Sequence, residues 1–227
     1  MRLFTALLFC ACASMAQAAP CNTGNFEAWL DGVKREAAAK GISQRAIEYG
    51  LEGVSFDQSI VRRDRGQKVF KQSFEEFSER MINPRMKLAA NAMRRHASLL
   101  SRVEQRFGVQ APVLVAIWGL ETGFGAVNGN FSTIKSIASL AYDCRRSDMF
   151  RAELFDALRI VDRGDMRPEE MKGAWAGEIG QTQFMPSSYI KFAVDFDGDG
   201  RRDLVHSAGD ALASTANYPV SYTHLTL

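Results

Sequence analysis

The chain has 227 residues, of which 46% are hydrophobic and 24% charged, and its formal net charge is +2. This composition is ordinary for a globular protein and too apolar for a disordered chain, and the length suffices for one good core with a small accessory lobe. The weak net charge and the lack of a Lys/Arg run or RNA-binding motif argue against nucleic acid as a partner.

The first residues have the order of parts that is typical of a secretory signal. Arg2 is a short positive region, residues 3–15 form an apolar stretch too short to span a bilayer, and residues 16–18 (AQA) fit a small-x-small cleavage site. We expect residues 1–18 to be removed, leaving a periplasmic protein, peripheral to the envelope, without a transmembrane helix. A buried N-terminal helix is one alternative. A lipoprotein is another, and it fits poorly because Cys21 follows a proline.

Removal of the signal leaves two cysteines, Cys21 and Cys144. In an oxidising compartment two cysteines pair readily, and such a bridge would join the new N-terminus to the middle of the core. Two free thiols are the alternative. Zinc is not expected, because neither cysteine has a second Cys or a His nearby at metal-ligand spacing.

Almost every segment is predicted to be helical. The first helix has Asn22 or Thr23 as its cap and Gly41 at its end, and Pro84 lies in the first turn of a long helix. The apolar pattern of residues 111–120 runs all round the helix and predicts a buried one. The expected helices are residues 26–40, 43–50, a segment with phenylalanines at 70, 74 and 77, 85–107, 111–120, 132–142, 147–161, one opening at Pro186, and 207–218. No convincing strand pair is found, so the fold class is mainly α.

The last nine residues, 219–227 (PVSYTHLTL), have a strand-like composition without a partner strand. We expect them to be a non-native tail on a chain truncated at about Tyr218. A genuine flexible C-terminus is the alternative.

A carboxylate stands where an apolar helix meets a glycine-rich turn. Glu121 follows packing residues such as Leu114 and Ile117, and Gly123 and Gly125 come directly after it. Partial desolvation raises the pKa of a carboxyl group and lets it donate a proton near neutral pH. The glycines would let a polymer approach the backbone. A turn-capping or arginine-paired glutamate is the alternative.

Residues 177–192 (GEIGQTQFMPSSYIKF) combine amide, hydroxyl and aromatic groups around a tight loop. Such a set suits a sugar, which has polar edges and apolar ring faces. Ser187 or Ser188 can cap the helix that Pro186 begins. The alternative is ordinary turn chemistry, with Phe184 and Met185 in the core.

The segment DFDGDGRRDLVH matches most positions of an EF-hand-like calcium loop. The matching positions are Asp195, Asp197, Asp199, the backbone of Arg201, and Asp203. His206 stands at the last position, where a bidentate Glu is expected, and His is a poor ligand for a hard cation. A structural calcium ion and an Asx-rich turn remain alternatives.

Two arginines follow Cys144 after a predicted helix. Arg145 and Arg146 could hold an acidic or polar substrate. A solvated pair, or partners for Asp143 and Asp148, are the alternatives.

In this order, GLETGFG, AYDCRR, GAWAGEIGQTQFMPSSY and AVDFDGDG resemble lytic murein transglycosylases of the membrane-bound lytic transglycosylase B type (family 3, SLT domain 2). The resemblance runs from about residue 26 to 218. It implies a goose-type, lysozyme-like α core with additional N-terminal helices. The catalytic domain would be residues 19–218, with a helical lobe at about 22–106 and the lysozyme-like core at about 107–218.

The resemblance implies cleavage of the β-1,4 bond between N-acetylmuramic acid and N-acetylglucosamine in peptidoglycan strands, forming 1,6-anhydromuramoyl ends without water and without a required cofactor. Glu121 matches the single catalytic glutamate, acting first as acid and then as base. Arg145 and Arg146 match the pair that meets peptide or carboxylate groups. The groove-lining residues would be Gln183, Phe184, Met185, Ser187 and Tyr189.

Two other functions fit the same chain. A muramidase-type hydrolase would need a second carboxylate to hold water, and Asp143 and Glu178 are the candidates. A non-catalytic peptidoglycan-binding module would not need Glu121.

Overall fold

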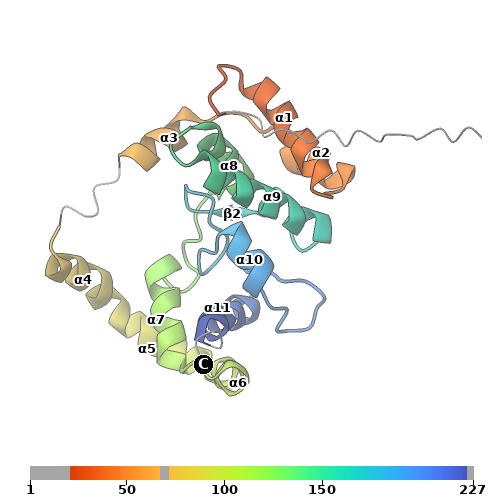
Figure 1. Cartoon of the computed structure of the whole chain (residues 1–227). Helices are drawn as coiled ribbons and strands as arrows, with labels where there is room; N and C mark the ends of the chain where they lie inside the picture. The colour runs from red at the N-terminus through yellow and green to blue at the C-terminus, as the bar shows by residue number, and fades with distance from the viewer. Residues whose placement is uncertain (1–20, 67–71, 224–227) are drawn as a thin grey trace, which may run out of the picture.

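The computed structural model describes residues 21–66 and 72–223, with side chains through residue 218, so the predicted signal peptide lies outside it. The described chain is mainly helical, as predicted (Figure 1). Its elements are α1 (Phe26–Ala39), α2 (Gln44–Leu51), α3 (Gln58–Arg65), α4 (Phe74–Ile82), the 3-10 turn η2 (Asn83–Arg85), α5 (Met86–Arg95), α6 (Ala97–Phe107), α7 (Ala111–Thr122), β1 (Phe131–Ser132), α8 (Thr133–Tyr142), α9 (Ser147–Arg163), β2 (Lys172–Gly173), α10 (Pro186–Phe192) and α11 (Ala208–Thr223).

The helix starts follow local capping chemistry. A helix was predicted to begin at Ser43, and Ser43 caps α2, since its hydroxyl accepts from the N–H of Ala46. Ser132 caps α8 in the same way by accepting from the N–H of Lys135. The predicted caps of α1 were wrong: Asn25 caps that helix, and Asn22 has a positive φ of 45°. One short antiparallel strand pair, β1 with β2, is present in the described chain and was not predicted.

The long helix predicted over residues 85–107 is broken in two. His96 leaves helical geometry between α5 and α6, and its ring lies 5.2 Å from that of Trp118. Burial of the imidazole lowers the pKa of His96, and the charge of Arg95 lowers it further. After the break at His96, α6 packs on α7 and α11.

At the C-terminal end, helix α11 continues to Thr223. The predicted stop at residue 218 was therefore wrong, and Pro219 lies inside the helix.

Two hydrophobic clusters form the interior. One joins α1, α2, α3, α8 and α9, and includes Trp29, Ile137 and Leu158. The other joins α5, α6, α7 and α11, and includes Leu114 and Trp118. In Figure 1 these groups form an upper and a lower half, with β2 and α10 between them. In both clusters, helices from early in the chain pack together with helices from late in the chain.

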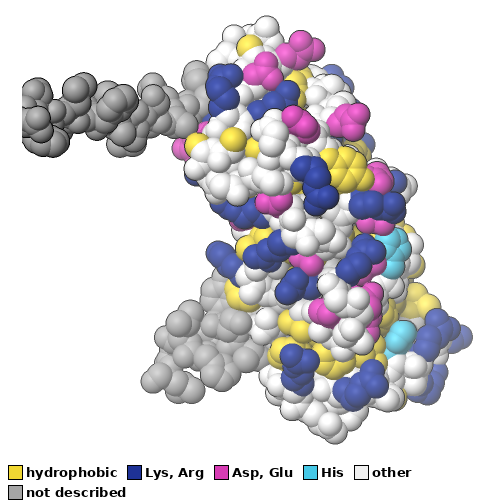
Figure 2. Space-filling view, turned by 90° about the vertical axis from the view of Figure 1, so that its right-hand side faces the viewer, with side chains coloured by type: hydrophobic (Ala, Val, Ile, Leu, Met, Phe, Trp, Pro, Cys, Tyr) yellow, Lys and Arg dark blue, Asp and Glu magenta, His cyan; other side chains and the backbone are white. Residues whose placement is uncertain are grey.

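On the face shown in Figure 2, basic and acidic side chains are interspersed, so this face does not present a surface of one sign. Within the described residues, no helix combines the length and the apolar character needed to cross a membrane.

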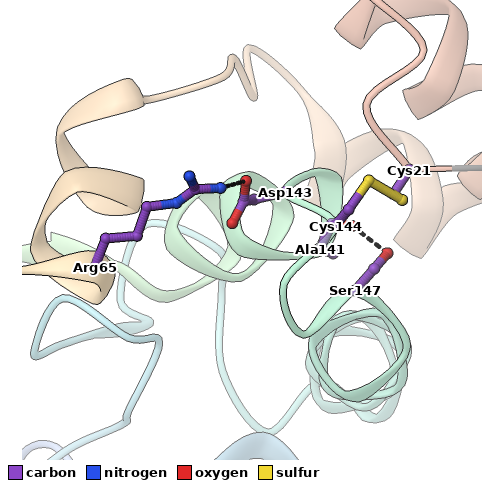
Figure 3. Close-up of a disulfide and its surroundings, with 6 residues drawn as sticks. All are labelled: Cys21, Arg65, Ala141, Asp143, Cys144 and Ser147. Atoms are coloured by element: carbon purple, nitrogen blue, oxygen red, sulfur yellow. Dashed lines mark hydrogen bonds and ion pairs between the residues drawn. A yellow bond between two sulfur atoms is a disulfide. The ribbon is translucent and has the colours of Figure 1, made fainter.

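Cys21 and Cys144 form a disulfide, which confirms the pairing favoured from the sequence; their Cα atoms are 5.3 Å apart. The bridge ties the start of the described chain to the turn between α8 and α9 (Figure 3). Next to it, the N–H of Asn22 donates to the carbonyl of Tyr142 at 3.0 Å. On the same turn, Asp143 pairs with Arg65 at 2.6 Å, which holds the end of α3 beside the bridge.

Removing the bridge should destabilise the fold. The bridge closes a loop of 123 residues, and the loss of such a constraint costs about 2–5 kcal/mol. We expect Cys21→Ser/Cys144→Ser to have a lower denaturant midpoint than the oxidised wild type. A reductant should lower the midpoint of the wild type and leave that of the double variant unchanged. Equal midpoints for oxidised wild type and variant would contradict this expectation.

Candidate active site

Glu121 lies in the last turn of α7, which Gly123 ends in the left-handed conformation (φ 61°). The prediction that α7 is buried all round was wrong. Leu114, Val115 and Trp118 are buried, whereas Val113 and Leu120 are 47% and 42% exposed. Val113, Leu120 and Glu121 follow helical spacing and share one face of α7. The carboxylate thus stands on an open apolar surface.

The pKa of Glu121 is raised, as the sequence predicted. Burial of the carboxyl by neighbouring groups is the main cause, and the negative charge of Glu178 adds to it. The side chain as a whole remains exposed, so the group that holds its proton more tightly is also accessible from outside. A protonated, accessible carboxyl group is what a proton donor requires.

Glu178 comes from the loop after β2. Its carboxylate accepts from the N–H of Ala176 at 3.0 Å, and its carbonyl accepts from the hydroxyl of Thr133 at 3.1 Å. Burial raises the pKa of Glu178, while the bond from Ala176 opposes that shift. Of the two carboxylates considered from the sequence, Glu178 is the one whose charge acts on Glu121. Asp143 is engaged by Arg65.

The glycine-rich turn after Glu121 has a packing role. A Cβ on Gly125 would lie 2.7 Å from the side-chain oxygen of Gln181, so protein fills the space beside this glycine, whereas a Cβ on Gly123 would have nothing within 4 Å and the space there is open. Phe124 has a positive φ of 66° and packs edge-on against Trp118. Its ring needs Gly119, where a Cβ would lie 2.6 Å from the ring. This role of Gly119 was not predicted from the sequence.

Gln181 binds the end of α7 to the loop beneath it. Its side-chain oxygen accepts from the indole N–H of Trp118 at 3.0 Å, and its amide donates to the carbonyl of Val205 at 3.1 Å. The hydroxyl of Thr122 donates to the carbonyl of Gln181 at 2.6 Å. The residue after Glu121 is therefore fixed directly to this loop.

Gln183 has the corresponding function on the other side of the loop. Its side-chain oxygen accepts from the N–H of Ala174 at 3.1 Å, and its amide donates to the carbonyls of Asn128 at 3.0 Å and Gly180 at 2.7 Å. All of these bonds are to backbone atoms of the loops around Glu121. Gln183 therefore positions the walls of the site, and its half-buried side chain has its main polar bonds satisfied within the protein.

The aromatic residues predicted to line a groove lie in the interior. Tyr189 has no exposed surface, and its hydroxyl donates to the carbonyl of Arg202 at 2.5 Å. Phe184 is 8% exposed, and its ring lies 5.9 Å from that of Tyr218. The prediction that these flat faces are offered to a ligand was wrong for Tyr189, because α10 packs its ring into the core. Met185 is half-buried.

The cap of α10 also differs from the prediction. Neither serine caps the helix through its own side chain, and Met185 is the N-cap residue. The buried carboxylate of Glu153 instead accepts from the N–H of Ser187 at 2.8 Å and from its hydroxyl at 2.7 Å. Ser187 is thus engaged with α9.

Arg145 and Arg146 both pair with Asp64, a buried residue of α3. Arg145 reaches it at 2.5 Å and also donates to the Asp64 carbonyl at 3.0 Å. Asp143 and Asp148 were the partners considered from the sequence, but the structure pairs both arginines with Asp64 instead. The side chain of Arg145 is 50% exposed, and that of Arg146 is 38% exposed.

The acidic loop brings together a different set from the one predicted. Among the described residues, oxygens of Asp195, Asp197 and Asp210 lie within 4.8 Å of one another. Asp199 instead accepts from the N–H of Arg201, and Asp203 accepts from the ring of His206 at 2.9 Å. The sequence missed Asp210 because it belongs to α11, beyond the twelve-residue loop pattern.

The donor chemistry of this cluster fits a hard cation. Three carboxylates offer oxygen ligands of the kind that calcium prefers. Asp210 is fully buried, and burial raises its pKa, with the nearby charge of Asp197 as a further cause. A divalent cation bound between crowded carboxylates stabilises them, because its charge offsets their mutual repulsion. His206 is turned to Asp203 and is not part of the cluster.

Comparison with known proteins places this geometry in a family. Residues 25–222 match the family described as "Transglycosylase SLT domain". The membrane-bound lytic murein transglycosylase B of Escherichia coli is 40% identical over 120 residues, which are 52% of this chain and 33% of that enzyme. The chain thus spans about a third of the length of that curated relative.

Solved structures agree with the sequence comparison. SltB3 from Pseudomonas aeruginosa, solved with NAG-NAM-pentapeptide, superposes with a TM-score of 0.83 at 41% identity, over 87% of this chain and 53% of SltB3. The Escherichia coli lytic transglycosylase Slt35, solved with calcium, has a TM-score of 0.75 at 29% identity, over 88% of this chain and 64% of Slt35. The predicted lysozyme-like fold is thereby confirmed, and the chain belongs to the transglycosylase SLT domain family, with lytic transglycosylases of the membrane-bound B and SltB type as its relatives.

Proposed function

We propose that this chain is a lytic transglycosylase that cleaves the β-1,4 bond between N-acetylmuramic acid and N-acetylglucosamine in peptidoglycan and leaves 1,6-anhydromuramoyl ends. The observation that carries the proposal is Glu121, an accessible carboxyl with a raised pKa at the end of α7. The match to the transglycosylase family supports the choice of this reaction.

The proposed reaction needs one proton carrier. Protonated Glu121 gives its proton to the glycosidic oxygen as the bond from that oxygen to C1 of the muramoyl residue breaks. The acetamido group of the sugar stabilises the cationic C1. The C6 hydroxyl then attacks C1 and gives its proton to the Glu121 carboxylate, which restores the acid. One C–O bond breaks and one forms, so no water is consumed.

Glu178 supports this reaction through its charge. Because it raises the pKa of Glu121, it keeps more of that group protonated at a given pH. Its own carboxylate is bound by the N–H of Ala176. A muramidase-type hydrolase remains the second candidate, since a carboxylate near the acid could instead hold a water molecule. A non-catalytic binding module is the third, and the raised pKa of Glu121 speaks against it.

Glycan would lie along the open face of α7. Exposed Val113 and Leu120 suit the apolar faces of sugar rings. Gln183 and Met185, both half-buried, remain candidates for the opposite wall, with Phe184, Ser187 and Tyr189 supporting it from behind.

We further propose a structural calcium ion held by Asp195, Asp197 and Asp210, with loop carbonyls such as that of Arg201 completing its ligands. The solved structure of Slt35 in complex with calcium supports this metal for a relative. The ion would hold the loop that follows α10 against the start of α11. The working location would be the periplasm, after removal of residues 1–18.

The decisive test of the reaction is the chemistry of the product ends. We expect wild-type protein to release muropeptides with anhydro ends from purified sacculi, as measured by mass spectrometry. Glu121→Gln should lower that release by at least about 100-fold, because an amide cannot carry the proton. Reducing ends in place of anhydro ends would establish a hydrolase. Binding of sacculi with no release by either protein would favour the non-catalytic module.

Neutralising Glu178 should shift the pH dependence of activity. Without its negative charge the pKa of Glu121 falls, so Glu121 loses its proton at lower pH. Activity that requires protonated Glu121 should therefore be lost at lower pH in Glu178→Gln than in wild type. Glu169→Gln, at an exposed site on the loop before β2, provides a charge-matched control and should leave the profile unchanged. Coincident profiles for Glu178→Gln and wild type would contradict the coupling.

Calcium should stabilise the folded chain through Asp210. An ion at about 100 times its dissociation constant adds about 2.7 kcal/mol, so we expect calcium to raise the melting temperature of the wild type. Asp210→Asn should abolish the increase, whereas Asp199→Asn should retain most of it. An increase lost in Asp199→Asn and kept in Asp210→Asn would instead support the ligand set predicted from the sequence.

A further inference from the structure

An arginine joins two helices at the turn that carries Glu121. Arg85 is the last residue of the 3-10 turn η2, between α4 and α5. Its Nε donates to the carbonyl of Gly119, in the last turn of α7, at 2.7 Å. Its Nη1 donates to the carbonyl of Met81, in the last turn of α4, at 2.6 Å. One planar guanidinium therefore bridges the ends of α4 and α7, two residues before the proton donor.

The end of α7 is a favourable place for this cation. The last carbonyls of an α-helix lack partners within the helix and form the negative end of its dipole. α7 has no basic residue in its last turn, which instead contains Glu121. Arg85 therefore supplies, from another part of the chain, the positive charge that this helix end does not contain itself.

The bonds of Arg85 go to helix ends and not to a carboxylate. Its side chain is half-buried, and it forms no ion pair among residues 21–66 and 72–218. A partly desolvated charge needs hydrogen-bond partners to offset the loss of water. The carbonyls of Gly119 and Met81 are such partners, so moving either helix away would leave this guanidinium less well satisfied.

Within the described part of the chain, α4 is otherwise weakly anchored. No residue of α4 is buried, and Phe74 is 77% exposed. Pro84, which follows α4, has no N–H with which to continue the helical hydrogen bonds. α5, by contrast, is anchored through Ala92, which packs in the same cluster as Leu114 of α7. The placement of α4 beside α7 (Figure 1) therefore depends on the η2 junction and on the guanidinium that spans it.

We propose that Arg85 is a positioning residue for the reaction of Glu121, which acts by setting the distance and angle between α4 and the end of α7. For its substrate and reaction this role rests on the proposed function. A glycan strand on the open face of α7 would reach Glu121 beside the last turn of α4. A displaced α4 would change how the glycosidic oxygen meets the carboxyl group, and a misplacement of about 1 Å can cost about 100-fold in rate.

The bridge requires an arginine and not only a positive charge. The Nε and Nη1 groups of a guanidinium lie in one plane and serve two carbonyls at once, whereas the ammonium of a lysine is a point charge on a flexible stem. Arg85→Lys would therefore keep a charge at the end of α7 without the bridge to Met81. The raised pKa of Glu121 has other causes, namely burial and the charge of Glu178. A positioning role should therefore leave the pH dependence of activity in place.

The kinetic test compares Arg85→Ala and Arg85→Lys with Arg94→Ala, which removes an exposed arginine from α5. The substrate is soluble, uncrosslinked peptidoglycan strands. In both Arg85 variants we expect kcat to fall about 10- to 100-fold while KM changes by less than about threefold, because orientation is lost and binding surface is kept. The pH profile should stay at its wild-type position. Arg94→Ala should keep the wild-type kcat.

Hydrogen exchange followed by mass spectrometry tests the bridge without turnover. In both Arg85 variants the amides of α4 should exchange at least about 10-fold faster than in the wild type, since a hydrogen bond from a charged group is lost. The amides of α9, which belongs to the other hydrophobic cluster, should keep their wild-type rates, and this excludes global unfolding. Arg94→Ala should leave exchange in α4 unchanged.

Recovery of kcat in Arg85→Lys would overturn the inference, because a charge at the helix end would then suffice. A loss of kcat without faster exchange in α4 would also overturn it, as would faster exchange with an unchanged kcat or a shifted pH profile. Product analysis of the wild type reports separately on the reaction. Faster exchange in α4 of the Arg85 variants, with no anhydro ends from the wild type, would uphold the bridge and reject the proposed activity.

Discussion

The bonds that Gln181 makes beneath the last turn of α7 are the constraint on which the site depends. Trp118 donates to its side chain and Thr122 to its carbonyl, and both residues flank Glu121 in the sequence. These polar groups are buried, so leaving one unpaired costs about 1–3 kcal/mol. The end of an otherwise apolar helix is thereby fixed to a loop that belongs to a different part of the chain. The position of Glu121 is thereby fixed, although its own carboxylate makes no hydrogen bond or ion pair within the described part of the chain.

The helices could be predicted because their signals are local. Ser43 caps α2, an apolar period marks α8 and α9, and the disulfide follows from the two cysteines left after residue 20. The break at His96 could not be read in the same way. It depends on the ring of Trp118 from another helix, and a 3.6-residue pattern carries no information about that contact. The exposed face of α7 was missed for the same reason, since exposure depends on which neighbours are absent.

The sequence indicated which residues lie at the site more reliably than it indicated what each of them does there. The glutamines and aromatics of residues 181–189 were identified as a group, yet most of them hold the loop together. A long polar side chain with several bonding atoms is equally suited to bind a sugar and to bind backbone, and only the packing decides between them. Asp210, Glu153 and Asp64 were missed because each reaches its partners across 7 to 82 residues. Their partners, by contrast, had been noticed in the sequence.

An accessible acid with a raised pKa requires two opposing conditions. Full burial would raise the pKa of Glu121 further and would also exclude the substrate, while full exposure would leave its pKa at the ordinary value. The structure meets both conditions by placing Glu121 on an open helix face and Glu178 behind it in a more buried loop. Partial burial of the carboxyl is the main cause of the raised pKa of Glu121, and the charge of Glu178 adds to it through space, so the rest of the side chain can stay exposed.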